Sequence, residues 1–172
     1  MRDKINSQLG GLVGKKLRCS GRASNLFWLE FGEMITITRR DKTEQTAEYS
    51  LHIQCSWRIT QQNTILTASR DFYSPNSECF EVDENFDWDI VGNNRFDERI
   101  KSFLHAVQNR LIVEKIDSDE IGGLKVFLSD NYVLEVFPDS SQDDEYSEFW
   151  RFFTRKDDIP HFVVTANGIE FN

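Results

Sequence analysis

Proline, cysteine and long apolar runs are all scarce in this 172-residue chain. No stretch approaches the roughly 20 consecutive apolar residues that a membrane-spanning helix needs, so we expect no membrane partner. The three cysteines include no C-x-x-C pair, which argues against a zinc site and against a disulfide framework. With only three prolines and 39% hydrophobic residues, the composition is that of a folded protein with ample core material.

A secretory signal is also missing from the beginning of the sequence. Residues 1–14 mix charged, polar and glycine residues, and they contain neither an apolar segment nor a cleavage pattern of small residues. An odd number of cysteines without paired spacing fits a reducing compartment. We therefore expect a cytoplasmic protein.

Basic residues are outnumbered, because 20 Lys and Arg stand against 29 Asp and Glu, which gives a net charge of −9. Affinity for nucleic acid comes mainly from basic side chains that neutralise phosphate groups. The sequence contains no basic cluster strong enough to offset its net charge. We therefore expect no nucleic-acid partner.

The sequence contains none of the common phosphate-binding, zinc-protease or serine-hydrolase motifs. Asp83, Asn85 and Asp87 match the first ligand positions of a calcium-binding EF-hand loop. However, Trp88 stands where that loop needs glycine, and Asn94 stands where it needs a bidentate glutamate. We therefore expect no metal ion, no cofactor and no catalytic residues.

Alternation of apolar and polar residues, which is typical of strands, covers most of the chain. The expected strands, about nine or ten, are 16–20, 26–31, 34–40, 48–60, 63–70, 124–129, 132–137, 148–154, 161–166 and 169–171. Asp130 and Asn131 predict a two-residue hairpin turn. Parallel strands would need a helical crossover between them, and helical patterns are few, so we expect mainly antiparallel sheet.

Two segments have helical spacing of their apolar residues. Asn94 can cap a long amphipathic helix whose apolar stripe runs from Phe96 to Leu111 and should pack on the sheet. A short amino-terminal helix is expected around Ile5 and Leu9. The predicted fold class is therefore α+β, with mainly antiparallel β-sheet, one long amphipathic helix and a short N-terminal helix.

For the domain organisation we expect one compact domain over residues 1–172. An alternative is a pair of strand-rich halves, 15–70 and 112–172. They would be joined by residues 71–111, which contain an acidic loop and the long helix.

The segment of residues 51–59 alternates most clearly. Read as one strand, it has an apolar face that includes Cys55, and a polar face made of His52, Gln54, Ser56 and Arg58. Such a polar row could line a ligand groove, in which Arg58 would bind a carboxylate or phosphate and His52 would act as an acid or base. The alternative is the solvated outer face of a half-buried strand.

Acidic residues gather in two windows that contain no Lys or Arg. Residues 71–94 hold seven of them, and residues 126–150 hold seven more, so the rest of the chain carries an excess of basic residues. If the two loops in these windows meet, they form a negative patch for a basic protein partner. The alternative is that they only keep the loops solvated. The expected partner-binding residues are Glu81, Asp83, Glu84, Phe86, Asp87, Trp88, Asp89, Asp143, Asp144 and Glu145.

Several short pieces resemble parts of uncharacterised bacterial proteins in which they occur in a similar order. These pieces are L-H-I-Q-C-S-W-R-I at 51–59, W-R-F-F at 150–153 and P-H-F-V-V at 160–164. The resemblance implies a compact bacterial domain, and it assigns no activity and no functional residue.

The sequence therefore favours a non-enzymatic module that binds a basic protein through its acidic loops. An immunity protein that neutralises a cationic toxin is one instance of this class. The second hypothesis is a small-ligand-binding protein or enzyme that uses the polar strand face around His52 and Arg58. A homo-oligomer is compatible with either hypothesis.

Overall fold

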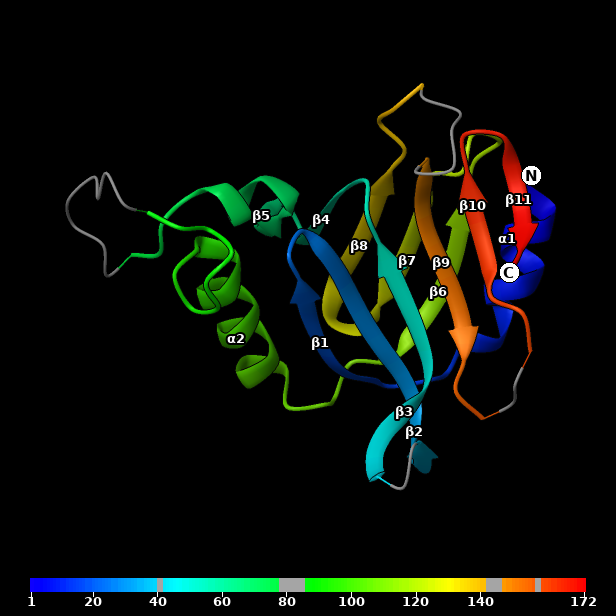
Figure 1. The fold of residues 1–172 in the computed structure, drawn as a ribbon, viewed down its shortest axis with the longest axis horizontal. Coiled ribbons are helices and arrows are strands. Elements are labelled where there is room, and N and C mark those ends of the chain that lie inside the picture. Colours follow the sequence, from blue (N-terminus) through cyan, green and yellow to red (C-terminus); the bar gives the residue numbers. More distant parts are fainter. Residues whose placement is uncertain (40–41, 78–85, 142–146, 157–158) are drawn as a thin grey trace.

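The computed structural model describes residues 1–39, 42–77, 86–141, 147–156 and 159–172, and these residues form two antiparallel sheets (Figure 1). In order across sheet 1, the strands are β1 (Leu17–Ala23), β2 (Leu26–Arg39), β3 (Lys42–Ile53), β9 (Glu148–Thr154), β10 (Phe162–Thr165) and β11 (Gly168–Phe171). In order across sheet 2, they are β5 (Thr64–Ala68), β4 (Ser56–Gln61), β8 (Tyr132–Phe137), β7 (Leu124–Leu128) and β6 (Val113–Ser118). The predicted α+β class with antiparallel sheet is confirmed.

Both sheets combine strands from the two ends of the chain. In sheet 1, β3 pairs with β9, and in sheet 2, β4 pairs with β8. The two strand-rich halves, 15–70 and 112–172, therefore do not form separate units in the described residues. Each sheet needs strands from both halves to bury its inner face.

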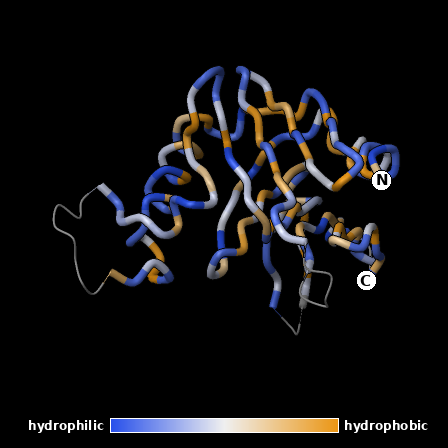
Figure 2. The backbone as a smooth tube through the Cα atoms, turned by 90° about the horizontal axis from the view of Figure 1, so that it is seen from above, coloured by the Kyte–Doolittle hydropathy of each residue, from blue (hydrophilic) through white to orange (hydrophobic). Residues whose placement is uncertain are grey.

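The core lies between the sheets, where alternate side chains of each strand meet. Phe27 of β2 stacks on Trp57 of β4 with ring centroids 4.1 Å apart, and Trp150 of β9 is fully buried. In the view from above, hydrophobic and hydrophilic residues alternate along the strands (Figure 2). This is the pattern of sheets that bury one face.

Helices cover opposite sides of the sandwich. The helix α2 (Arg95–Val107) packs against β5, β1 and the short helix η2 (Ser69–Tyr73), and α1 (Arg2–Leu9) packs against β6. Figures 1 and 2 show α2 on one side of the sheets and α1, with both chain termini, on the other. Two further short helical turns are η1 (Gly10–Leu12) and η3 (Ser129–Asn131). None of the helices in the described ranges is long and apolar enough to cross a membrane.

Some element boundaries differ from the predicted ones. The strands expected at 26–31 and 34–40 form the single strand β2, because Gly32 with φ +95° makes a bulge and pairing with β3 resumes at Met34. The long helix ends at Val107, since Gln108 adopts a left-handed conformation with φ 46°. Strand β6 was not predicted, because its burial does not alternate around a register shift after Val113.

Candidate functional site

The structure breaks the expected polar row of residues 51–59. Strand β3 ends at Ile53 and β4 begins at Ser56 in the other sheet, so the prediction of one continuous strand is wrong. At the corner, the N–H groups of Gln54 and Cys55 both donate to the Phe149 carbonyl, at 2.8 and 3.2 Å. The apolar side chains stay in the core on both sides of the corner, while the polar ones face opposite surfaces of the sandwich.

His52 and Arg58 are consequently separated. His52 lies on the outer face of sheet 1, where β3 pairs it with Arg151, and Arg58 lies on the outer face of sheet 2 opposite Glu135. Arg58 Nε donates to Glu135 at 2.5 Å, and its guanidinium stacks 5.0 Å from the ring centroid of Phe137. The groove that these side chains were expected to line together is not formed.

Gln54, Cys55 and Ser56 line a small pocket of about 240 Å³ at the corner. The Ser56 hydroxyl donates to Asp139 at 2.5 Å, and Tyr73 lines the same pocket. Burial raises the pKa of the Cys55 thiol to about 12, which disfavours the reactive thiolate form.

The first acidic window is described over residues 71–77 and 86–94, and residues 86–94 form a loop that leads into α2. We call it the acidic loop. It is held by Arg22, whose side chain is only 3% exposed and points from the edge strand β1 toward the helix. Arg22 donates to both carboxylate oxygens of Asp97, at 2.8 and 2.9 Å, and to the main-chain carbonyls of Trp88 and Asp89. The hydrogen bond to Asp97 raises the pKa of the guanidinium, which therefore stays charged.

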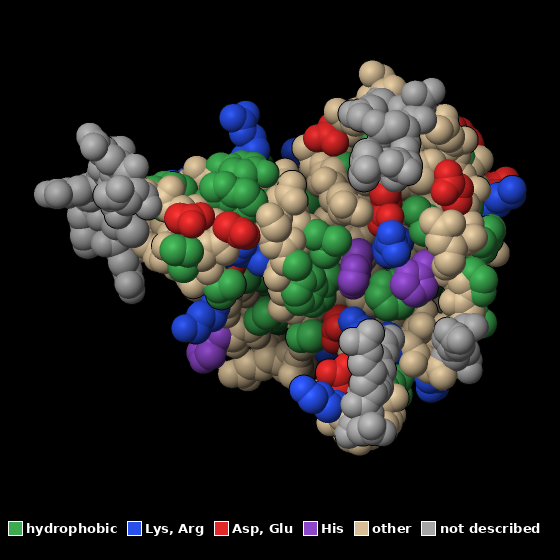
Figure 3. Space-filling model, in the orientation of Figure 1, with side chains coloured by type: hydrophobic (Ala, Val, Ile, Leu, Met, Phe, Trp, Pro, Cys, Tyr) green, Lys and Arg blue, Asp and Glu red, His purple; other side chains and the backbone are tan. Residues whose placement is uncertain are grey.

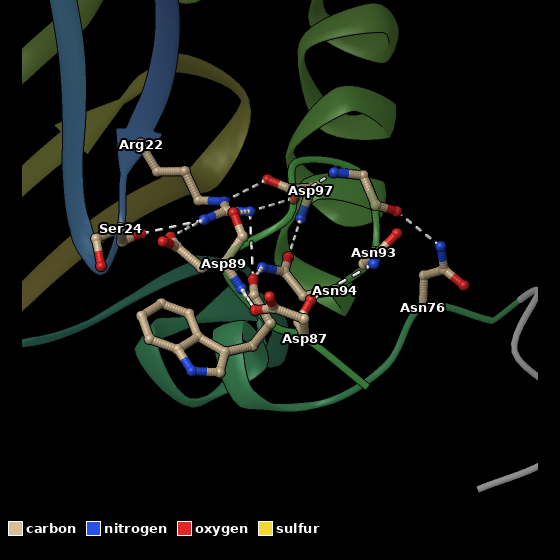
Figure 4. Close-up of polar contacts among 10 residues, drawn as sticks. Arg22, Ser24, Asn76, Asp87, Asp89, Asn93, Asn94 and Asp97 are labelled. Atoms are coloured by element: carbon tan, nitrogen blue, oxygen red, sulfur yellow. Dashed lines mark hydrogen bonds and ion pairs between the residues drawn. The ribbon is translucent and has the colours of Figure 1, made fainter. Parts of the chain in front are cut away.

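A second anchor is Asn94, which is fully buried and caps α2 as predicted (Figure 4). Its side-chain oxygen accepts from the Asp97 N–H at 2.9 Å, and its side-chain nitrogen donates to the Trp88 carbonyl at 2.8 Å. The Gly92 N–H donates to Asp97 at 2.7 Å. One buried cation and one buried amide thus fix the loop to the start of the helix.

Apolar side chains are left exposed beside these anchors. The exposed fraction is 54% for Tyr73, 53% for Ile90 and 79% for Val91. The Tyr73 and Trp88 rings meet edge to face, with centroids 5.1 Å apart. We call this surface the loop platform, and it consists of Tyr73, Asp87, Trp88, Asp89, Ile90 and Val91.

The expected partner-binding residues divide into two groups. Phe86, Asp87, Trp88 and Asp89 lie in the acidic loop, and both carboxylates are exposed. Glu81, Asp83, Glu84, Asp143, Asp144 and Glu145 lie outside the described residues.

The two acidic windows approach each other at one place in the described residues. Tyr73 and Asp139 line the same corner pocket. Beyond it, the acidic loop lies on the α2 side of the molecule, while residues 138–141 lie above β8 in Figure 1.

The outer face of sheet 1 carries a chain of rings that crosses four neighbouring segments. Successive centroid distances are 6.1 Å from Trp28 to His52, 5.0 Å from His52 to Phe153 and 4.0 Å from Phe153 to His161. We call these four residues the ring row. Figure 3 shows two histidines beside basic and hydrophobic side chains in the middle of this face. Trp150 and Phe152 face the core between the sheets, whereas Trp28 and Phe153 lie on the outer face, where Phe153 is still buried.

The anchors of the acidic loop were not found from the sequence. Arg22 lies next to Gly21 and Ala23 in a short strand, and no motif marks it as a buried cation. The one available signal was the pair of carboxylates in the first helical turn, Asp97 and Glu98.

No group of three or more His, Cys, Asp or Glu side chains within the described ranges could hold a metal ion. Comparisons with known proteins find no matching family model, no similar curated protein and no similar solved structure. The resemblance to bacterial proteins therefore rests on the short pieces at 51–59, 150–153 and 160–164 alone.

Proposed function

We propose that this protein is a non-enzymatic binding module that holds a basic protein partner on the loop platform. The observation that carries the proposal is the combination of a firmly anchored loop with exposed apolar side chains. Arg22 and Asn94 are buried and bonded to the loop, while Ile90 and Val91 point their apolar surface to solvent.

Exposed apolar side chains add little to the stability of the isolated fold. Clustered with aromatic rings, they are typical of surfaces that become buried on binding. The anchors supply preorganisation, since a loop that is already ordered loses less conformational entropy when a partner binds. Tyr73 and Trp88 fit the role of aromatic contact residues.

The charge of the platform indicates what kind of partner it suits. Asp87 and Asp89 are exposed beside the apolar residues, and the buried Arg22 pairs with the Asp89 carboxylate at 3.4 Å. A basic partner would be steered toward these carboxylates, and would then bury Ile90 and Val91. An immunity-type inhibitor of a cationic toxin remains one instance of this class.

The second hypothesis from the sequence, a ligand groove around His52 and Arg58, receives no support. The two side chains lie on opposite outer faces, so no single small molecule can contact both.

The proposal is tested by affinity purification of the tagged full-length protein from the cells that produce it, at low and at high salt. We expect one stoichiometric basic partner that is released at high salt, because screening weakens attraction between exposed charges. Val91→Asp should abolish the recovery, since it places a charge where the apolar contact forms.

Ile121→Asp is the matched control, because Ile121 is 70% exposed and lies in the turn between β6 and β7 on the other side of the molecule. This variant should recover the partner as the wild type does. Equal recovery with Val91→Asp and Ile121→Asp, or no partner from repeated purifications, contradicts the proposal.

A further inference from the structure

Three buried polar atoms on the outer face of sheet 1 have no hydrogen-bond partner among the described residues. They are Ser50 Oγ, His52 Nε2 and Arg155 Nε. Buried polar groups are nearly always paired, because an unpaired group has lost its hydration without compensation. Several such atoms on one face are therefore a reason to look for a ligand that supplies the missing partner.

The three atoms lie close together. Ser50 stands between Glu30 of β2 and Phe153 of β9 in the sheet register. Arg155 stacks 5.5 Å from the Phe153 ring centroid and donates to Glu30 at 2.8 Å, so its side chain crosses over Ser50, which is fully buried. His52 is the next residue of β3 on the same face.

The unpaired atoms are suited to donate hydrogen bonds. Arg155 Nε can only donate, and a serine hydroxyl or a neutral imidazole can donate as well. Burial lowers the pKa of His52 to about 4, and the charges of Arg155 and Arg151 lower it in the same direction. Arg155 is paired with Glu30 and Arg151 with Glu148, and the charge of Glu148 acts on the His52 pKa in the opposite direction. The ligand proposed from these donors is an anion that takes the place of Glu30 on Arg155 and accepts from the unpaired atoms.

A flat apolar surface adjoins these donors. The Trp28 indole lies across Gly21 of β1, so closely that a Cβ atom on that glycine would be 2.4 Å from Trp28 Cζ2. One face of the indole therefore rests on the backbone of β1. Trp28 forms the end of the ring row, next to His52. An aromatic ligand can stack on such a surface.

We propose that the outer face of sheet 1 binds a small aromatic anion, a planar ring that carries a carboxylate or phosphate group. The ring stacks on Trp28 of the ring row, and the anionic group receives hydrogen bonds from Arg155, His52 and Ser50. This site is distinct from the loop platform, and it does not depend on the function proposed there.

Binding requires Arg155 to turn from Glu30 toward the anion, because its side chain covers Ser50. Glu30 keeps other donors after that movement. Its second oxygen accepts from Cys19 Sγ at 3.1 Å and from Thr46 Oγ1 at 3.4 Å. The carboxylate would therefore not be left without hydrogen bonds when Arg155 moves.

The test is an NMR titration of the full-length protein with phenyl phosphate and, separately, with benzoate, following the signals of the three histidine rings. We expect the signals of His52 and His161 to shift, while His105 on α2 stays unchanged. The bound anion should raise the pKa of His52 from about 4, because a negative charge favours the imidazolium form. Either aryl anion should bind about tenfold more tightly than inorganic phosphate or acetate, because of the stacked ring.

Arg155→Gln should weaken binding about tenfold, since it removes the charge that faces the anion. Arg58→Gln is the matched control, because Arg58 also pairs with a glutamate and stacks on a phenylalanine, but on the outer face of sheet 2. His52→Gln provides a second test if Arg155→Gln does not fold. The proposal is overturned if neither aryl anion shifts His52, if inorganic phosphate binds as tightly as phenyl phosphate, or if Arg58→Gln weakens binding as much as Arg155→Gln.

Discussion

The acidic loop and the outer face of sheet 1 use their polar groups in opposite ways. In the loop, Arg22 and Asn94 bond fully to their neighbours, and the groups left over are the exposed apolar side chains of Ile90 and Val91. On the sheet, the rings pack on one another, and the groups left over are polar atoms such as Ser50 Oγ. The kind of group that the fold leaves without a contact therefore indicates the kind of ligand: exposed apolar side chains suit a protein partner, and unpaired buried polar atoms suit a small polar ligand.

The largest expected effect comes from removing the buried cation of the loop. Arg22→Ala should lower the free energy of unfolding by about 3 kcal/mol or more, because it leaves the Asp97 carboxylate without its bidentate partner in a largely buried place. Chemical denaturation measures the effect. Arg58→Ala should cost under about 1 kcal/mol, since the Arg58 side chain is 41% exposed. Equal costs for the two variants would show that Arg22 is not a special anchor.

The second anchor should have a smaller effect. Asn94→Ala removes the helix cap and the bond to the Trp88 carbonyl, and it should cost about 1–2 kcal/mol in the same measurement. Asn93→Ala is the neighbouring control, with a side-chain bond of 3.5 Å to the Asp87 carbonyl, and it should change the stability by less than about 0.5 kcal/mol. A larger loss from Asn93→Ala would contradict the assignment of the anchor.

On the outer face of sheet 1, removing a polar group should stabilise the protein, whereas removing the anchors of the acidic loop should destabilise it. Ser50→Ala removes a buried hydroxyl that has no partner in the described residues, so it should raise the free energy of unfolding by about 1 kcal/mol in the absence of added anions. Thermal and chemical denaturation both report this change. A loss of stability would mean that the hydroxyl is already satisfied, and it would remove the contrast with Asn94.

The pH dependence of stability should reveal His52. Its pKa is lowered from 6.5 to about 4 in the folded protein, mainly by burial, so the unfolded chain binds more protons between these values. Stability therefore decreases as pH falls from about 6.5 toward 4, by about 1 kcal/mol for this residue after allowance for its partial exposure. His52→Gln should lose less stability than the wild type over this range. Parallel curves for the two proteins would refute the assignment.

Local patterns in the sequence predicted the elements whose geometry is set by neighbouring residues. The helix cap at Asn94 was predicted correctly, and Asp130 and Asn131 both have positive φ at the hairpin, although the connection also includes Ser129. In both features, the residue type determines the conformation of the backbone beside it. A few neighbouring residues in the sequence are therefore enough to predict them.

Features that depend on distant residues were missed. The corner at Gln54 and Cys55 has no glycine or proline, and the apolar alternation continues through it because both sheets need the same inward face. The polar residues on its two sides were therefore assigned to one surface, although they belong to two. Arg22 was missed for a similar reason, since its partners in the acidic loop and in α2 lie more than 60 residues away in the chain.

The binding role proposed for the acidic loop requires that the loop is ordered before a partner arrives. Hydrogen exchange of the Gly92 amide tests this claim directly, because that amide donates to Asp97 at 2.7 Å although the residue itself is exposed. We expect exchange on the order of 100-fold slower than in an unstructured peptide, and a loss of this protection in Arg22→Lys, which cannot make the bidentate pair. Exchange at the unprotected rate in the wild type would contradict the account.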